Sequence, residues 1–285
     1  MKLCDLHTHS TCSDGTLTPT ELVKLALEKN LAAVALTDHN TVAGLPEFLE
    51  AARGTELEAV PGIEFSVDYG DIELHILGLF VKPEHYGPIT ERVEDMLRRK
   101  EQSNIDLVKN LEQAGIFLSY EDIKAATTTG QVNRALIAAE MLRKGYVGSI
   151  QEAFSKYLKQ SHGYYNPPKR PDAFETIRFI RSLGAVAVWA HPFLNLKTES
   201  VLRECLQEAV PKGLAAMETM YSSYSPETEA AARRIAREFG LLESGGSDFH
   251  GDTKPHIRLG CGKGNLAVPA AFADTLKNSR KAAVL

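Results

Sequence analysis

Histidines and carboxylates recur in short polar clusters along this chain, and most of the clusters come directly after an apolar run. The chain contains 9 histidines. Imidazole and carboxylate are groups with which proteins hold zinc, manganese or iron. In His7-Thr8-His9 the two imidazoles stand two residues apart, a spacing that turns both to the same side of an extended chain. The residue types and their spacing therefore predict a metal site.

Nine residues share this chemistry, and we predict them as the metal ligands: His7, His9, Asp14, His39, Glu64, His75, His191, Asp248 and His250. Six imidazoles with three carboxylates are too many for one ion and enough for two or three. Each motif alone has an ordinary alternative; Thr37-Asp38-His39-Asn40, for example, could cap a helix. Residues of metal-binding types follow several separate strand patterns, and this recurrence favours metal binding over the ordinary alternatives. His75 differs, because its apolar run continues to Leu79.

The elements that must position these residues are strands alternating with helices. Strand patterns cover residues 2–4, 31–36, 59–63, 72–80, 185–190, 214–218 and 241–244. Most are followed by an amphipathic helical pattern, which predicts parallel βα units, and about seven of them favour a closed barrel over an open sheet. The C-terminal ends of parallel strands share one face, so the ligands are expected to meet there.

Between residues 82 and 168 this alternation stops. Helical patterns replace it at 89–114, 120–126, 132–144 and 149–158. We therefore predict an α/β barrel domain made of residues 1–81 and 169–285, interrupted by a helical domain of residues 82–168 that acts as a lid over the substrate.

The composition excludes several classes of protein. With 44% hydrophobic residues and a net charge of −5, the chain is typical of a globular protein and has no overall attraction for duplex nucleic acid or an anionic membrane. No apolar run approaches the roughly 18 residues of a membrane span, and no secretory signal is evident. We expect a cytoplasmic protein with no membrane partner.

Taken in order, the motifs resemble those of the PHP (polymerase and histidinol phosphatase) family. They are Asp5-Leu6-His7-Thr8-His9-Ser10, Ser13-Asp14-Gly15, Thr37-Asp38-His39, Pro61-Gly62-Ile63-Glu64, His75, Ala190-His191-Pro192 and Gly246-Ser247-Asp248-Phe249-His250. The chain looks most like bacterial members with an inserted helical domain, which act on nucleotides and related small phosphate esters. The resemblance covers residues 1 to about 262.

The resemblance implies a distorted (β/α)7 TIM-like barrel with a trinuclear centre of Mn, Fe or Zn. It implies a first ion on His7, His9, Glu64 and Asp248, a second on Glu64, His75 and His191, and a third on Asp14, His39 and His250. A hydroxide bridging the first two ions at Glu64 would attack phosphorus. The group that protonates the leaving group is not identified.

We accordingly predict a metal-dependent phosphoesterase, a hydrolase of small phosphate esters, above all nucleotide mono- or 3′,5′-bisphosphates. Divalent ions in the predicted number make the pocket cationic, which suits a phosphate. The resemblance suggests that Arg134 in the insert binds phosphate. Arg143, Lys144 and Lys169 are further candidates, for a second phosphate.

Several alternatives stay open. The same ligands serve a 5′–3′ exoribonuclease acting on short RNA, a cyclic-phosphate hydrolase and a histidinol-phosphate hydrolase. A metal-dependent amidohydrolase also uses His-x-His on a barrel, although nine ligands exceed the needs of two metals. A PHP module that binds metal without catalysis is the alternative from a different class.

Overall fold

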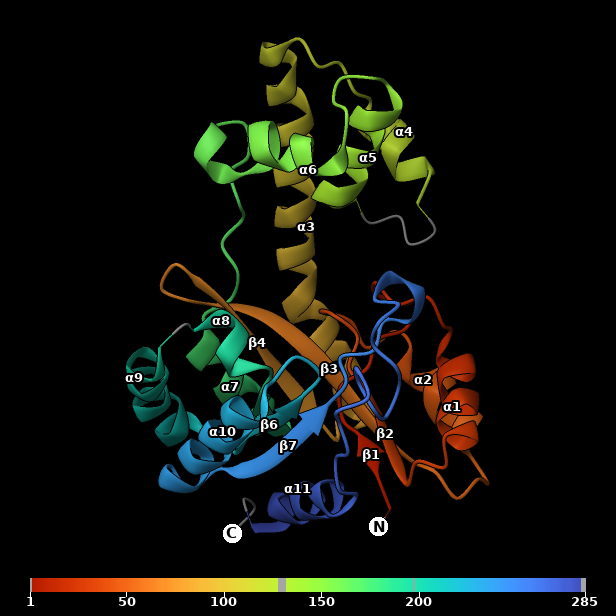
Figure 1. The fold of residues 1–285 in the computed structure, drawn as a ribbon, viewed down its shortest axis with the longest axis vertical. Helices are drawn as coiled ribbons and strands as arrows, with labels where there is room; N and C mark the ends of the chain where they lie inside the picture. The colour runs from red at the N-terminus through yellow and green to blue at the C-terminus, as the bar shows by residue number, and fades with distance from the viewer. Residues whose placement is uncertain (1, 128–131, 197, 283–285) are drawn as a thin grey trace. The chain divides into compact units, whose positions relative to one another are not determined.

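Seven β-strands form a single sheet in which each strand pairs with its neighbours in the sequence. The computed structural model describes residues 2–127, 132–196 and 198–282. Its strands are β1 (Cys4–Asp5), β2 (Ala33–Leu36), β3 (Glu58–Tyr69), β4 (Ile72–Leu79), β5 (Val186–Trp189), β6 (Ala216–Tyr221) and β7 (Leu242–Gly246). Hydrogen bonds from Leu6 N to Gly245 O and from Asp248 N to His7 O join the first strand to the last (Figure 1). The sheet is thus a nearly closed barrel, and the predicted mixed α/β fold is confirmed.

The fourth strand departs from the predicted parallel pattern. β4 runs antiparallel to both β3 and β5, whereas the other neighbours are parallel. The reason is the two-residue connection Gly70-Asp71, which is long enough for a hairpin but far too short for a parallel crossover. The expectation that Glu64 follows its strand is wrong, because Glu64 lies within β3. His75, whose apolar run continues past it, lies in the first half of β4. Because β4 is reversed, its first half reaches the barrel end where the parallel strands finish.

Helices surround the barrel and cover its far end. They are α1 (Pro19–Glu28), α2 (Leu45–Ala52), α7 (Ala173–Ser182), α8 (Pro192–Asn195), α9 (Glu199–Ala209), α10 (Pro226–Glu238) and α11 (Ala271–Ala282). In Figure 1, α1 and α2 lie side by side, α1 next to β2 and α2 next to β3, and α10 lies beside β6 and β7.

No sequence pattern had been assigned to α11. Ala273 and Leu276 of this helix join the apolar barrel core, and Lys277 pairs with Glu58 at the start of β3. The helix therefore covers the end of the barrel away from Glu64.

A second unit, residues 91–170, contains the helical insert, and the barrel unit comprises residues 1–90 and 171–285. The insert contains most of α3 (Tyr86–Leu111), together with α4 (Tyr120–Ala125), α5 (Arg134–Arg143), α6 (Ile150–Ala153) and a π-helical turn (Phe154–Leu158). Its own core includes Leu107, Ile137 and Met141. The predicted domain bounds were 82 and 168, and the lid role stays a prediction. None of the described helices is long and apolar enough to cross a membrane.

Asp5 ties the first strand to the last. Its side chain is fully buried and accepts hydrogen bonds from the backbone N–H groups of Ser247 and Gly260, each at 2.8 Å, and from the Ser247 hydroxyl. Burial raises the pKa of this carboxyl, and the same hydrogen bonds act in the opposite direction. The network fixes the chain on both sides of Asp248 and holds β7 against β1.

Replacing Asp5 with asparagine should lower the free energy of unfolding by about 2–4 kcal/mol, because an amide cannot accept at both of its ends from buried N–H donors. Chemical denaturation measures this loss. Asp71→Asn, in the exposed β3–β4 turn, is the matched control. If Asp5→Asn cost no more than this control, the closing network would not stabilise the barrel.

Candidate metal centre

The nine predicted ligands converge at the barrel end where β1, β2, β5 and β7 finish. Their ligand atoms form four overlapping groups, and within each group all atoms lie within 4.8 Å of one another. The groups are His9, Asp14, His39 and His250; His7, His9 and Asp248; His7, Glu64 and His191; and His39, Glu64 and His75. No predicted ligand lies outside the cluster.

Glu64 is at the centre of the cluster. Its Oε2 atom lies 3.2 Å from Nε2 of both His7 and His9 and 3.0 Å from Nδ1 of His39. Its Oε1 atom faces the opposite set, 2.8 Å from His75 Nδ1 and 3.3 Å from His191 Nε2. One carboxylate thus presents each of its oxygens to a different set of imidazoles, the arrangement expected of a bridging ligand.

A more open side of the cluster is formed around Asp14. Its carboxylate lies 3.2 Å from His250 Nε2 and 3.8 Å from His9 Nδ1. The side chain of Asp14 is 50% exposed, whereas those of His9 and Glu64 are fully buried. The cluster therefore has a buried side around Glu64 and a solvent-accessible side at Asp14.

The geometry groups the ligands somewhat differently from the three sets that the family resemblance implied. His9 joins Asp14 and His250 as well as His7 and Asp248. His75 and His191 both contact Glu64, but they belong to separate groups. Which ligand serves which ion stays a prediction.

Buried carboxylates outside the ligand set orient the cluster. Glu218 of β6 is fully buried; its Oε1 lies 2.9 Å from His7 Nδ1, and its Oε2 accepts from the backbone N–H of His191 at 2.6 Å. A carboxylate on the outer nitrogen of a histidine fixes the ring and its tautomer, as is common at metal sites. Asp38 helps to hold the loop that carries Asp14, because its carboxylate accepts a hydrogen bond from Ser10 N at 2.7 Å.

Two of the predicted ligands have a strained backbone. His191 and Asp248 have positive φ angles of 33° and 58°, a conformation uncommon for residues with a Cβ atom and associated with functional sites. Next to them, Gly246 lies so close to β1 that a Cβ atom there would stand 2.4 Å from the His7 Cβ. Only glycine allows β7 to approach His7 this closely.

Electrostatics keep the carboxylates of the cluster ionised. Burial would raise the pKa values of Glu64 and Asp248, but the surrounding histidines hold both well below their usual range. Burial would lower the pKa of His9, yet Asp248 and Glu64 outweigh it and raise that pKa to about 9. Glu64 likewise raises the pKa of His75 to about 10 against the effect of burial. At His39 burial dominates and lowers the pKa to about 3.

The donor atoms fit divalent ions. Several buried atoms have no hydrogen-bond partner within the described chain: Nε2 of His7, both ring nitrogens of His9, Nδ1 of His39 and His75, and Oε2 of Glu64. Buried polar atoms are nearly always satisfied, so a concentration of unsatisfied ones indicates a missing partner. Nε2 of His7 and His9 and Nδ1 of His39 lie 3.0–3.2 Å from Glu64 Oε2 without hydrogen-bond alignment, as ligands of a shared cation would.

Sequence reasoning missed several residues that contact this cluster. Glu218 had a usable signal, because it ends the predicted strand 214–218 in the manner of the ligands themselves. No sequence signal points to Tyr221 or Lys254. Tyr221 of β6 and Lys254 in the turn after β7 both donate hydrogen bonds to Asp248 Oδ2, each at 2.7 Å. Asp5 was noted only as part of a motif.

The predicted phosphate-binding residues lie in the helical unit. Arg134 donates to Leu158 O at 3.1 Å, and its guanidinium lies 4.4 Å from the centre of the Tyr165 ring. Arg143 pairs with Glu140 on its own helix, and Lys144 donates to Phe117 O at 3.2 Å. Lys169 is exposed. Their roles in substrate binding stay predictions.

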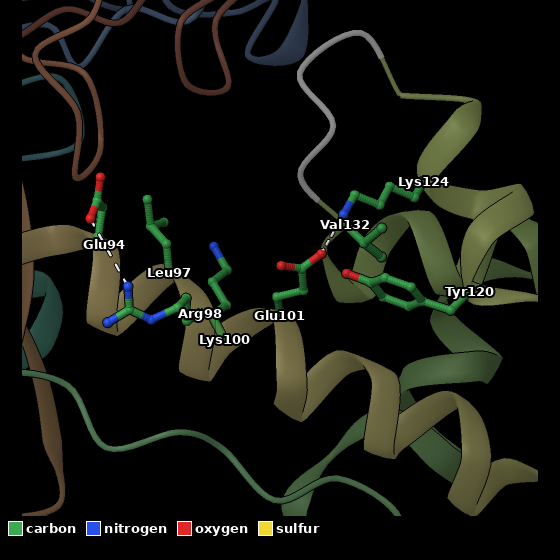
Figure 2. Close-up of a pocket in the computed structure, with 8 residues that line it drawn as sticks. All are labelled: Glu94, Leu97, Arg98, Lys100, Glu101, Tyr120, Lys124 and Val132. Atoms are coloured by element: carbon green, nitrogen blue, oxygen red, sulfur yellow. Dashed lines mark hydrogen bonds and ion pairs between the residues drawn. The ribbon is translucent and has the colours of Figure 1, made fainter. Parts of the chain in front are cut away.

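The helical unit also contains a pocket of about 300 Å³. Its lining consists of Glu94, Leu97, Arg98, Lys100, Glu101, Tyr120, Lys124 and Val132 (Figure 2). Figure 2 shows Arg98 directed toward Glu94 and Lys124 directed toward Glu101, and both contacts are ion pairs. Because acidic partners offset these cations, the pocket is not a strongly anion-binding surface.

Curated relatives agree with the geometry. The 5′-3′ exoribonuclease of Haemophilus influenzae is 33% identical over 87% of this chain and 90% of its own length. The 3′,5′-nucleoside bisphosphate phosphatase of Chromobacterium violaceum is 29% identical over 86% of each chain. Both names denote hydrolysis of a phosphate ester bond, so the predicted enzyme class, a phosphoesterase, is confirmed.

Solved structures share the whole fold. A proposed metal-dependent phosphoesterase of Bifidobacterium adolescentis superposes with a TM-score of 0.79 at 26% identity, covering 98% of this chain and 96% of its own. A Chromobacterium violaceum protein described as an amidohydrolase, solved with bound sulfate and no metal, matches with the same score, identity and coverage.

A family model described as the PHP domain matches residues 5–166, more than half of the chain. Together with a relative 33% identical over 87% of the sequence, this match confirms the resemblance read from the motifs: the chain belongs to the PHP domain family.

Proposed function

We propose that this enzyme uses two to three divalent ions, Mn, Fe or Zn, to hydrolyse small phosphorylated molecules, above all nucleotide monophosphates or 3′,5′-bisphosphates. The observation that carries the proposal is the cluster of buried, unsatisfied imidazole nitrogens around the two oxygens of Glu64. Such ions supply Lewis-acid chemistry when bound: they polarise the phosphoryl group and lower the pKa of water. The cytoplasmic location stays a prediction.

Each protein group has a part that follows from its position. The histidines around Glu64 would hold the ions, and Glu218 orients the His7 ring through its Nδ1 atom. Asp14, at the exposed edge, lies where a substrate can approach from solvent. Rigid positioning of this kind suits phosphoryl transfer, in which catalysis consists of placement and charge neutralisation.

Two observations favour nucleotide substrates. The phosphatase relative is named for a nucleoside bisphosphate, and the exoribonuclease relative for RNA. A nucleotide monophosphate or bisphosphate is the smallest substrate that combines a nucleoside, common to both names, with a phosphate ester that can be hydrolysed.

A second candidate, 5′–3′ hydrolysis of short RNA, is favoured by identity, because the exoribonuclease of Haemophilus influenzae is the more similar of the two relatives at 33% against 29%. Cations of the insert such as Arg98, Lys124 and Arg143 are engaged in ion pairs, which favours a short substrate over a long strand. Phosphate release from a 3′,5′-bisphosphate and mononucleotide release from a 5′-phosphorylated oligonucleotide, measured side by side, decide between the two.

Replacing Asp248 with alanine should abolish phosphate release in the presence of Mn²⁺. Loss of one metal ligand removes several kcal/mol of transition-state stabilisation, about 10³-fold or more in kcat/KM. Asp252→Ala, an exposed aspartate on the same loop, should retain the activity. An Asp248→Ala protein as active as the wild type would remove the proposed centre.

Replacing Glu218 with glutamine should weaken metal affinity by about 10- to 100-fold, because the amide no longer fixes the His7 ring as a carboxylate does. Competition with a chelating dye measures this affinity. Glu243→Gln, on the neighbouring strand β7 and paired with Arg233, serves as the control. Equal affinities in the two variants would mean that Glu218 stabilises the fold without tuning the metal site.

Replacing Arg134 with lysine should reduce kcat/KM for a nucleotide bisphosphate by about 10- to 100-fold, since it removes one or two charge-assisted hydrogen bonds. Lysine keeps the charge but lacks the planar fork that binds phosphate bidentately. Arg99→Lys, on an exposed part of α3, should have no effect. An unchanged kcat/KM in Arg134→Lys would mean that Arg134 does not bind substrate phosphate and serves only its contacts with Leu158 and Tyr165.

A further inference from the structure

Lys254 is the lysine at the edge of the metal-ligand cluster. It follows a short 3-10 turn, Gly251–Thr253, just after the last two ligands in the sequence. The turn is fastened to the Asp14 loop, because Asp252 N donates to Thr16 Oγ1 at 2.9 Å and Thr253 Oγ1 donates to Asp14 O at 3.0 Å. The backbone of Lys254 is therefore held in place, and its flexible side chain extends from a fixed point.

The ammonium group of Lys254 contacts a buried ligand while remaining open to solvent. Its Nζ lies 2.7 Å from Asp248 Oδ2, and the side chain is 40% exposed, against 8% for Asp248. The same oxygen accepts from the Tyr221 hydroxyl at 2.7 Å. The other oxygen, Oδ1, faces His9 at 3.3 Å. Asp248 is thus provided with partners on both of its oxygens.

Lys254 has donors left over. An ammonium carries three N–H groups, and within the described chain Asp248 is the one hydrogen-bond acceptor of this side chain. Two N–H groups therefore remain for a molecule that arrives from solvent. A positive charge with unused donors, beside the proposed phosphoesterase centre, has the chemistry of an anion contact.

We propose that Lys254 binds a non-bridging oxygen of the substrate phosphate and makes the enzyme prefer terminal phosphate monoesters over internal diesters. The inference rests on the proposed function. A monoester carries about two negative charges at neutral pH and a diester carries one, so an added cation stabilises the bound monoester more. Lys254 would then be a specificity-determining residue of the site.

The test compares Lys254→Met and Lys254→Arg with Lys277→Met in Mn²⁺-loaded protein. Lys277 is the matched control, because it also pairs with a carboxylate at 2.7 Å, that of Glu58, and is 53% exposed. Calorimetry gives the Kd of inorganic phosphate, a chelating dye gives the metal affinity, and kinetics give kcat/KM for a nucleotide monoester and for a diester.

We expect Lys254→Met to weaken phosphate binding by about 10-fold or more and to lower the monoester-to-diester ratio of kcat/KM by a similar factor. Lys254→Arg should recover most of both losses, and Lys277→Met should match the wild type. Metal affinity should stay within about threefold of the wild type in all three variants, a change below 1 kcal/mol.

Three results would overturn the inference. Unchanged phosphate affinity and monoester preference in Lys254→Met would exclude a phosphate contact. A parallel fall in metal affinity would mean that Lys254 positions Asp248 instead. A wild-type protein that binds no phosphate would overturn both the inference and the proposed function.

One result separates the two claims. Phosphate binding that depends on Lys254, in a protein that hydrolyses no ester, would contradict the proposed function and support the phosphate contact.

Discussion

A fully buried carboxylate, Glu64, is the feature on which the rest of the structure depends. An isolated charge at this depth would cost several kcal/mol, so it must be matched by cations or by protons on its neighbours. Five imidazoles approach its two oxygens, and their number exceeds what one carboxylate requires. This excess of imidazoles over the need for charge balance, together with their unsatisfied ring nitrogens, indicates a site built to hold metal ions.

The barrel accounts for how these groups meet. Parallel strands bring His7, His39, His191 and Asp248 to one end, and the reversed strand β4 adds His75 from the opposite chain direction. Closure of β7 on β1 joins ligands that are more than 240 residues apart in the sequence. The same closure explains why buried hydrogen bonds and a glycine contact are concentrated between these two strands.

Most of the fold and most of the clustered side chains could be predicted from strand patterns and ligand chemistry, because a metal-binding residue type follows most of the apolar runs. Asp14 and His75 do not follow an apolar run, and their assignment depended on residue type and the family motifs. The reversal of β4 could not be read from periodicity, since an antiparallel strand and a parallel strand have the same apolar pattern. Glu218 acts through His7, a partner 211 residues away in the sequence. Lys254 is only six residues from Asp248, but its contact depends on the turn between them, which periodicity does not describe. α11 was not anticipated because its apolar contribution is mostly small side chains such as Ala273.

Membership of the PHP domain family and the geometry around Glu64 agree on a phosphoesterase, and we propose that its ligands hold a multinuclear metal centre. Anomalous X-ray diffraction at the Mn, Fe and Zn absorption edges, from crystals grown without chelator, tests this claim most directly. We expect two or three peaks at the cluster, with Glu64 between two of them and ligand distances of about 2.0–2.2 Å if the metal is zinc. Well-ordered ligands with no anomalous peak among them, in protein that hydrolyses phosphate esters, would contradict it.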